Sequence, residues 1–197
     1  MAPTLGGAAA MNIHGKNAFV AGPIGEHIRH LQLLLASGEL RELTPDEPLF
    51  RAVVGGFGEL GVIVQVTLQC KRVHSGLMEV RAEASRTLDD MLDLFEREQA
   101  GADYLVGWID GFAGGASKGR GLVHIARQLQ AGEDPAAIET LQVARQELPP
   151  RLFGLIPKSW MWRLMKPLAH PWGMRLVNWG KYLSARWLEH GKRYRQG

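Results

Sequence analysis

The amino-acid sequence predicts an α+β protein, and three features of the chain support this class. Apolar runs rich in β-branched residues, such as residues 62–68, have the composition of strands. Leucine, methionine and phenylalanine recur at helical spacing in residues 85–96. Glycine and proline turns separate these runs. With 197 residues and 46% hydrophobic content, the chain can build one ordinary core or two small ones.

The composition also limits where the chain is expected to work. Cys70 is the single cysteine, so no disulfide can form within the chain and a reducing compartment is favoured. No window approaches twenty uninterrupted apolar residues, and the first residues lack the pattern of a signal peptide. We therefore expect a cytoplasmic protein, with membrane association as an additional property to be tested.

The first distinctive stretch is residues 4–17, in which two adjacent glycines and three alanines leave little side-chain bulk. Such a backbone can approach a large or flat ligand closely, with its N–H groups free to bind it. The same composition is also typical of a tight turn that leads into a buried helix. The side chains of His14, Lys16 and Asn17 favour a site that holds a polyanionic cofactor and a polar substrate.

A hairpin is expected next, with strands over residues 27–35 and 39–43 and a turn at Ser37 and Gly38. His27 and His30 lie three residues apart in this region. On a strand that spacing points to opposite faces, which argues against a shared metal ion, and no metal site is predicted.

A short helix is then predicted over residues 44–54, with Thr44 as its cap. Residues 56–61 match the dinucleotide fingerprint G-x-G-x-x-G, but that motif needs a strand before it and a helix after it. Here a helix precedes the glycines and the strand 62–68 follows them. The glycines are therefore predicted to turn the chain rather than to form a Rossmann site, and residues 70–74 are expected to close the first unit.

The next segment is predicted to be a helix over residues 85–96, capped by Thr87, followed by two neighbouring strands. The strands are residues 104–110 and 119–126. Asp110 is expected to hold Arg120 or to cap the turn between the strands. From the residues alone Trp108 is predicted to be a core residue, and only the family resemblance described below implies that it lines a pocket.

Three of these stretches, residues 4–17, 25–29 and 49–63, carry a family resemblance. The pattern Thr-x-Gly-Gly-Ala-x-Ala-x-x-x-His-Gly-Lys-Asn resembles the second half of the FAD-binding domain of FAD-linked oxidases, the vanillyl-alcohol oxidase or PCMH type. Within this family the chain is most similar to the decaprenylphosphoryl-ribose oxidase branch, and it also resembles the delta-24 sterol reductase branch. The resemblance is specific over roughly residues 1–70 and weaker through Arg120.

The resemblance implies an FAD-dependent oxidoreductase in which a substrate C–H gives a hydride to the flavin. It implies contacts to FAD from nine residues and contacts to substrate from two others. The implied cofactor-binding residues are Thr4, Leu5, Gly6, Gly7, Met11, Asn12, Ile13, His14 and Ile63. The implied substrate-binding residues are Lys16 and Trp108. No general base can be assigned. Ala18 and Phe19 replace two histidines of the closest relatives, which makes the pocket more apolar.

Residues 128–150 are polar and acidic and are expected to form a mobile surface segment. From residue 151 onward the chain holds ten Lys and Arg against the single acid Glu189, a net charge of +9, whereas residues 1–150 carry −6. Five of the six tryptophans also lie there. Trp interleaved with basic residues favours a membrane interface or a lipid phosphate over nucleic acid. The alternative is a helical lid that packs on another part of the enzyme.

The expected organisation has three parts: residues 1–74 as the second subdomain of a PCMH-type FAD-binding domain, 75–150 as part of an α+β substrate (cap) domain, and 151–197 as a basic, Trp-rich helical tail. The chain is expected to be a fragment whose partner is the other FAD-binding half or a neighbouring subunit. The expected substrate is a sugar, a polyol, a polyprenyl-phosphate sugar or a sterol-like molecule. The alternative function is a non-catalytic scaffold whose tail binds an anionic membrane or a partner chain.

Overall fold

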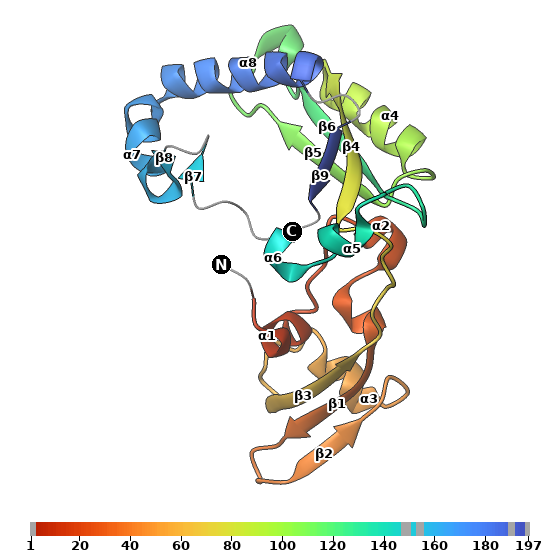
Figure 1. Cartoon of the computed structure of the whole chain (residues 1–197). Helices are drawn as coiled ribbons and strands as arrows, with labels where there is room; N and C mark the ends of the chain where they lie inside the picture. Colours follow the sequence, from red (N-terminus) through yellow and green to blue (C-terminus); the bar gives the residue numbers. More distant parts are fainter. Residues whose placement is uncertain (1–2, 147–150, 153–155, 189–191, 196–197) are drawn as a thin grey trace. The chain divides into compact units, whose positions relative to one another are not determined.

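The computed structural model describes residues 3–146, 151–152, 156–188 and 192–195. The chain divides into two units, Met1–Arg72 (unit 1) and Val73–Gly197 (unit 2), and each has its own main sheet (Figure 1). All strand pairs in both sheets are antiparallel, and helices accompany each sheet. The predicted mixed α and β class is therefore confirmed.

Unit 1 is built on a three-stranded sheet of order β2-β1-β3. Its strands are β1 (Ile28–Leu34), β2 (Leu40–Leu43) and β3 (Val62–Leu68). The predicted hairpin is confirmed: β1 pairs with β2, and Gly38 turns the chain with a φ of 83°, which residues with a Cβ rarely adopt. The other elements are α1 (Leu5–Ala10), α2 (Ala18–Ala21), the 3₁₀ turn η1 (Ile24–His27) and α3 (Pro48–Val53).

The core of unit 1 lies where α1 and α3 pack on the sheet. Leu31 and Leu33 of β1 alternate into it, and Ile28 joins them because the strand register shifts between Ile28 and His30. The buried members are Ala9, Ile28, Leu31, Leu33, Leu43, Phe50 and Val53. The structural consequence is that α1, which carries the glycine-rich stretch, is fixed to the sheet through Ala9.

The prediction that Thr44 caps the next helix is wrong. Helix α3 begins at Pro48, and Glu47 occupies the N-cap position without a side-chain cap bond. The Glu47 carboxylate instead accepts from the backbone N–H of Thr44 at 2.8 Å, which closes a turn ahead of the helix. Proline at the first helical position explains the later start, because it disfavours helical geometry in the residue before it.

The G-x-G-x-x-G segment has the context predicted for it, with α3 before it and β3 after it. Four residues here have positive φ: Gly55, Phe57, Gly58 and Gly61. A Cβ at Gly61 would stand 2.6 Å from the carbonyl oxygen of Leu34. The glycines are therefore required by the turn into β3 and by its close approach to β1.

Unit 2 contains a four-stranded sheet of order β5-β6-β4-β9. Its strands are β4 (Leu77–Ser85), β5 (Tyr104–Ile109), β6 (Gly121–Gln128) and β9 (Lys192–Arg195). The predicted pairing of residues 104–110 with 119–126 is confirmed, with Trp108 opposite Leu122. The loop between them contains the 3₁₀ turn η2 (Gly115–Ser117).

Helices cover both faces of this sheet. Helix α4 (Leu88–Glu98) begins at the predicted cap, since Thr87 Oγ1 accepts from the N–H of Asp90 at 3.1 Å. Its Met91 and Leu94 pack with Val123 of β6, whereas the neighbouring residue Leu122 packs on the other face. That second face is contacted by α8 (Pro171–Leu188), which crosses one end of the sheet and extends beyond it (Figure 1).

The remaining elements of unit 2 are short. They are α5 (Ala137–Thr140), α6 (Val143–Gln146), β7 (Arg151–Leu152), β8 (Ile156–Pro157), η3 (Lys158–Trp160), α7 (Met161–Met165) and η4 (Lys166–Leu168). No helix among the described residues is long and apolar enough to cross a bilayer.

Two predictions for unit 2 need correction. The polar segment 128–150 is not simply a surface loop, because Asp134 is 7% exposed and accepts hydrogen bonds from the hydroxyls of Ser75 and Thr140. Residues 147–150 lie outside the described part. The basic pattern at the C-terminus was expected to be helical, but Lys192–Arg195 forms β9 and pairs with β4. Pairing with an available sheet edge outweighs the local helical pattern.

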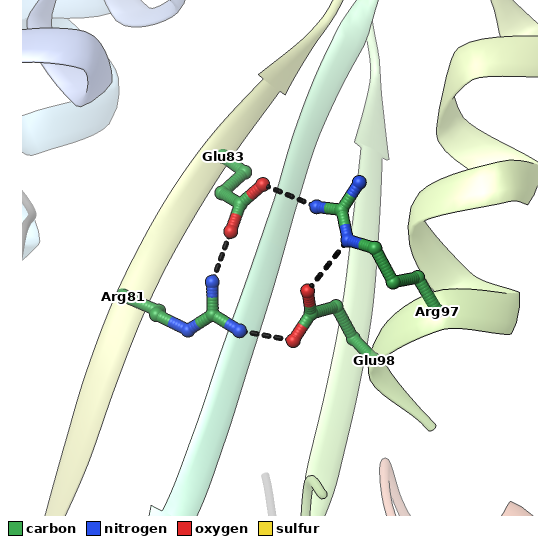
Figure 2. Close-up of polar contacts among 4 residues, drawn as sticks. All are labelled: Arg81, Glu83, Arg97 and Glu98. Carbon is green, nitrogen blue, oxygen red and sulfur yellow. Dashed lines mark hydrogen bonds and ion pairs between the residues drawn. The ribbon is translucent and has the colours of Figure 1, made fainter. Parts of the chain in front are cut away.

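A ring of four charged side chains joins α4 to β4 (Figure 2). Arg81 pairs with both Glu83 and Glu98, and Arg97 pairs with the same two carboxylates at 2.8 and 2.9 Å. The hydrogen bond from Arg97, together with the charges of Arg81 and Arg97, holds the pKa of Glu98 below its usual value although burial opposes this. The ring therefore stabilises the contact between α4 and β4 only while Glu98 is ionised.

We expect unit 2 to lose stability in acid through this ring. Because the pKa of Glu98 is lower in the folded chain than in the unfolded one, its contribution is present above about pH 4.5 and is lost as the pH falls further. Glu98→Gln should reduce the acid dependence of the urea midpoint, and the exposed control Glu96→Gln should keep the wild-type dependence. Identical acid profiles for Glu98→Gln and wild type would contradict the role of the ring.

Candidate functional site

The glycine-rich stretch folds as the short helix α1 with a side-chain cap. Thr4 Oγ1 accepts from the N–H of Gly7 at 3.1 Å, and the Thr4 carbonyl accepts from the N–H of Ala8 at 2.8 Å. Ala8 and Ala9 are buried. Of the two structures that the sequence allowed for this stretch, the tight turn into a buried helix is the one that forms. The N–H of Gly7 was expected to be free for a ligand, but it is bonded to Thr4.

Helix α1 lies against the beginning of β3. A Cβ built on Gly6 would stand 3.7 Å from the carbonyl oxygen of Ile63, an ordinary contact distance. The Ile63 side chain packs on the core, while its neighbours Val62 and Val64 are 62% and 51% exposed. Gly6 and Ile63 therefore lie close together in the structure. The part of Ile63 that faces Gly6 is its backbone, not its side chain.

Asn12 holds the end of α1 in place. It adopts a φ of 44°, and its Oδ1 accepts from the N–H of Gly25 at 2.9 Å. Beside it, the carbonyl of Ile13 accepts from the N–H of Ile24 at 2.9 Å. On the other side of α1, the N–H of Phe57 donates to the carbonyl of Ala10 at 2.9 Å. Asn12 thus connects the glycine-rich stretch to η1, a role that the sequence did not indicate.

The other predicted residues of this stretch point toward solvent. Leu5, Met11 and Ile13 are 45%, 52% and 37% exposed, and His14 and Lys16 are also exposed. Val62 and Val64 are exposed as well, so unit 1 leaves five of these apolar side chains, one imidazole and one ammonium group open to solvent. The signal that could have indicated Val62 and Val64 is the apolar run of β3, since such runs are typical of strands covered on both faces.

In unit 2, the carboxylate of Asp110 accepts hydrogen bonds from three residues. Arg120 donates to its Oδ2 through Nε at 3.0 Å and Nη2 at 2.8 Å. Its Oδ1 accepts from the N–H of Phe112 at 3.1 Å and from Nδ2 of Asn178 at 2.8 Å. Both predicted roles of Asp110, holding Arg120 and capping the turn, are confirmed. The contact with Asn178 of α8 was not predicted.

Asp110 is 2% exposed, yet its surroundings favour the ionised form. Burial by itself would raise the pKa of the carboxyl. The hydrogen bonds from Asn178, Arg120 and the N–H of Phe112, together with the Arg120 charge, outweigh burial and lower this pKa below its usual value. Asp110 is therefore a structural anion and not a proton donor at neutral pH.

Trp108 lies on the face of the sheet that α8 covers. It packs with Leu122 and Tyr182 in a small core, and Lys181 Nζ stands 4.3 Å from the centre of its ring.

An open hollow of about 480 Å³ lies beside α8. It is lined by Asp110, Phe112, Ala113, Gly114, Ser117, Arg120, Trp172, Arg175, Leu176 and Trp179. The sequence did not indicate the roles of Asn178 and Tyr182. A single amide in a largely apolar helical stretch is the pattern that could have pointed to a buried contact at Asn178.

The two histidines considered as a metal pair have other partners. His27 Nε2 lies 2.8 Å from the carbonyl oxygen of Ala21, and His30 pairs with Glu42. Within the described part of the chain, no three His, Cys, Asp or Glu side chains are grouped as metal ligands.

Comparison with known proteins shows that this chain is similar to parts of several oxidases. It is 34% identical over 124 residues to the decaprenylphosphoryl-β-D-ribose oxidase of Mycolicibacterium smegmatis, covering 61% of this chain and 27% of that protein. It is 28% identical over 176 residues to the glycolate oxidase subunit GlcE of Escherichia coli, covering 84% and 45%. It is 38% identical over 68 residues to the D-arabinono-1,4-lactone oxidase of Yarrowia lipolytica, covering 34% and 13%.

The chain spans less than half the length of each of these relatives. No protein-family model matches it. The resemblance to oxidases, which the glycine-rich stretch and the segment 49–63 indicated, is confirmed by these relatives.

We expect Asn12 to be required for the stability of unit 1. Asn12→Ala removes the bond to Gly25 and replaces Asn, which tolerates positive φ, with Ala, which tolerates it less well, so it should lower the free energy of unfolding by about 2–3 kcal/mol. Asn12→Gly removes only the bond and should cost about 1–2 kcal/mol. Asn17→Ala, at a position without a side-chain cap bond, is the control. Equal urea midpoints for all four proteins would refute this role.

We also expect Asp110 to hold α8 on the sheet. Asp110→Ala leaves Arg120 and Asn178 without this acceptor and should lower the unfolding free energy of unit 2 by about 3–5 kcal/mol. Asn178→Ala should cost about 1–2 kcal/mol, and the two changes together should cost less than their sum. The exposed Asp93→Ala is the control, and urea unfolding is the measurement. Strictly additive effects would show that Asp110 and Asn178 do not act together.

Proposed function

Since this chain resembles FAD-linked oxidases and its known relatives include oxidases, we propose that it is part of an FAD-dependent oxidoreductase acting on CH–OH groups. In this proposal, residues 1–74 are the second subdomain of a PCMH-type FAD-binding domain, and 75–150 belong to its substrate domain. Residues 151–197 form the basic part that follows. The rest of the FAD site comes from another segment of a longer protein or from a neighbouring subunit.

The observation that carries the proposal is the surface around α1. Gly6 and Gly7 add no side-chain bulk to α1, and the apolar side chains of Leu5 and Met11 next to them in the chain are exposed, which suits a flat aromatic ring system. These features fit one wall of a flavin site. The proposed cofactor-binding residues are Thr4, Leu5, Gly6, Gly7, Met11, Asn12, Ile13, His14 and Ile63. From the geometry above, Asn12 acts by holding the wall in shape, and Ile63 acts through its backbone.

The residues of the chain then have separate roles in the proposed reaction. FAD, when bound, accepts the hydride that leaves the substrate carbon. The exposed ammonium of Lys16 is suited to orient a substrate hydroxyl or phosphate. Trp108 is proposed to line the substrate side, with its position fixed by Lys181 and Tyr182. We propose a sugar, a polyol or a polyprenyl-phosphate sugar as substrate, in line with the names of two of the relatives. Glycolate, from the name of the third, and a sterol-like molecule are the other candidates.

The proposal is tested by flavin retention. The purified chain is mixed with FAD, desalted and examined for flavin absorbance. Wild type should retain FAD, and Gly6→Val should lose it because the added side chain occupies the wall beside Ile63. Gly101→Val is the matched control, since a Cβ there meets open space and its backbone needs no positive φ. Ile13→Glu should also weaken retention, whereas the exposed Val20→Glu should not.

Two results would count against the proposal. One is complete loss of flavin from the wild-type chain, both alone and with a co-expressed neighbouring FAD-binding segment. The other is equal retention by wild type and by Gly6→Val. If flavin is retained, bleaching of its absorbance under anaerobic conditions by sugars, polyols, sterols or glycolate would identify the substrate class.

A further inference from the structure

Helix α8 presents an exposed apolar face, here called its outer face, beside the loop between β5 and β6. Trp172, Leu176 and Trp179 follow one another at spacings of four and three residues, so they lie on one face. Their exposed fractions are 74%, 61% and 51%. Asn178 and Tyr182 lie on a neighbouring side of the helix, where they contact Asp110 and the sheet. A surface helix normally turns charged residues outward, so this arrangement requires a partner surface.

The charge on the same face is positive. Arg175 lies among these apolar residues, and its guanidinium stands 5.1 Å from the centre of the Trp172 ring. The sequence from residue 148 to residue 188 contains seven Lys and Arg residues and no Asp or Glu. The acid that lines the neighbouring hollow, Asp110, is buried and bound by Arg120 and Asn178. A partner with negative charge therefore complements this face.

A second group of the same composition precedes α8. Trp160 and Trp162 are 53% and 59% exposed, and the Arg163 guanidinium stands 5.3 and 5.4 Å from the centres of their rings. The turn η4 connects this group to α8. The pairing of exposed tryptophan with arginine is thus repeated along residues 160–179 and is not confined to one position.

We propose that the outer face of α8 binds the surface of an anionic phospholipid bilayer. Tryptophan prefers the headgroup region, and basic residues are attracted to anionic lipids, so both features of the face are explained by one partner. The helix lies flat because its inner side is fixed to the sheet by Asn178 and Tyr182, and it is not apolar enough to span. The hollow of about 480 Å³ beside it, with Phe112 40% exposed at its lining, offers room for part of a lipid.

The proposal is tested by co-sedimentation of the whole chain with vesicles. Vesicles of phosphatidylcholine that contain phosphatidylglycerol should bind the chain. Vesicles of phosphatidylcholine alone should bind it at least tenfold more weakly. High salt should reduce binding to the anionic vesicles. Brominated lipids should quench tryptophan emission on binding, which places the indole rings at the bilayer. No flavin enters this test, so its outcome is independent of the proposed oxidoreductase function.

Matched variants connect the binding to α8. Arg175→Glu should lower the partition coefficient by about fivefold or more, because each basic residue near an anionic surface contributes about that factor. Trp172→Ala combined with Trp179→Ala should lower it by tenfold or more. The controls are Arg29→Glu, an exposed basic residue of unit 1, and Ile138→Ala, an 86% exposed apolar residue of α5. Circular dichroism checks that each variant is folded.

Three outcomes would overturn the proposal: equal binding to both kinds of vesicle, no binding to either kind, or α8 variants that bind as tightly as the controls. The second outcome would assign the face to a protein surface instead. Binding that is lost in Arg175→Glu and kept in Arg29→Glu would support it.

Discussion

The buried carboxylate of Asp110 is the interaction on which the arrangement of unit 2 depends. It receives donors from Phe112 and Arg120 of the loop between β5 and β6 and from Asn178 of α8, so two segments far apart in the chain meet at one anion. A buried charge is stable only when it is bound in this way. Because the contact fixes the rotation of α8 about its axis, it also decides that Trp172, Leu176 and Trp179 are exposed.

Unit 1 uses backbone contacts where unit 2 uses a charge. Its glycine-rich helix is held by Asn12 on one side and by the turn before β3 on the other, through the bonds to Gly25 and from Phe57. Positive φ angles at Asn12, Gly55 and Phe57 make these close approaches feasible. The result is a rigid surface of small and apolar groups, which is what a wall for a planar cofactor needs. Rigidity matters here, since such a site functions only if its geometry is formed in advance.

Several elements were predictable because their signals are local. The hairpin of β1 and β2 follows from the turn at Gly38, α4 follows from Thr87 and its apolar spacing, and β3 follows from its β-branched run. The start of α3 was mispredicted because Pro48 has more influence than the preceding threonine. Strand β9 was mispredicted for a different reason: a partner edge on β4, more than a hundred residues away in the sequence, supplies its hydrogen bonds.

The sequence by itself determined the α+β class, the resemblance to FAD-linked oxidases and the concentration of basic and aromatic residues after residue 150, because composition, spacing and motif are properties of the chain alone. It also indicated the pair Asp110 and Arg120. Only the tertiary structure decided that Asn178 completes that pair, that Asn12 serves the scaffold, and which face of α8 is exposed. These depend on which side of each element meets another, and no local pattern contains that information.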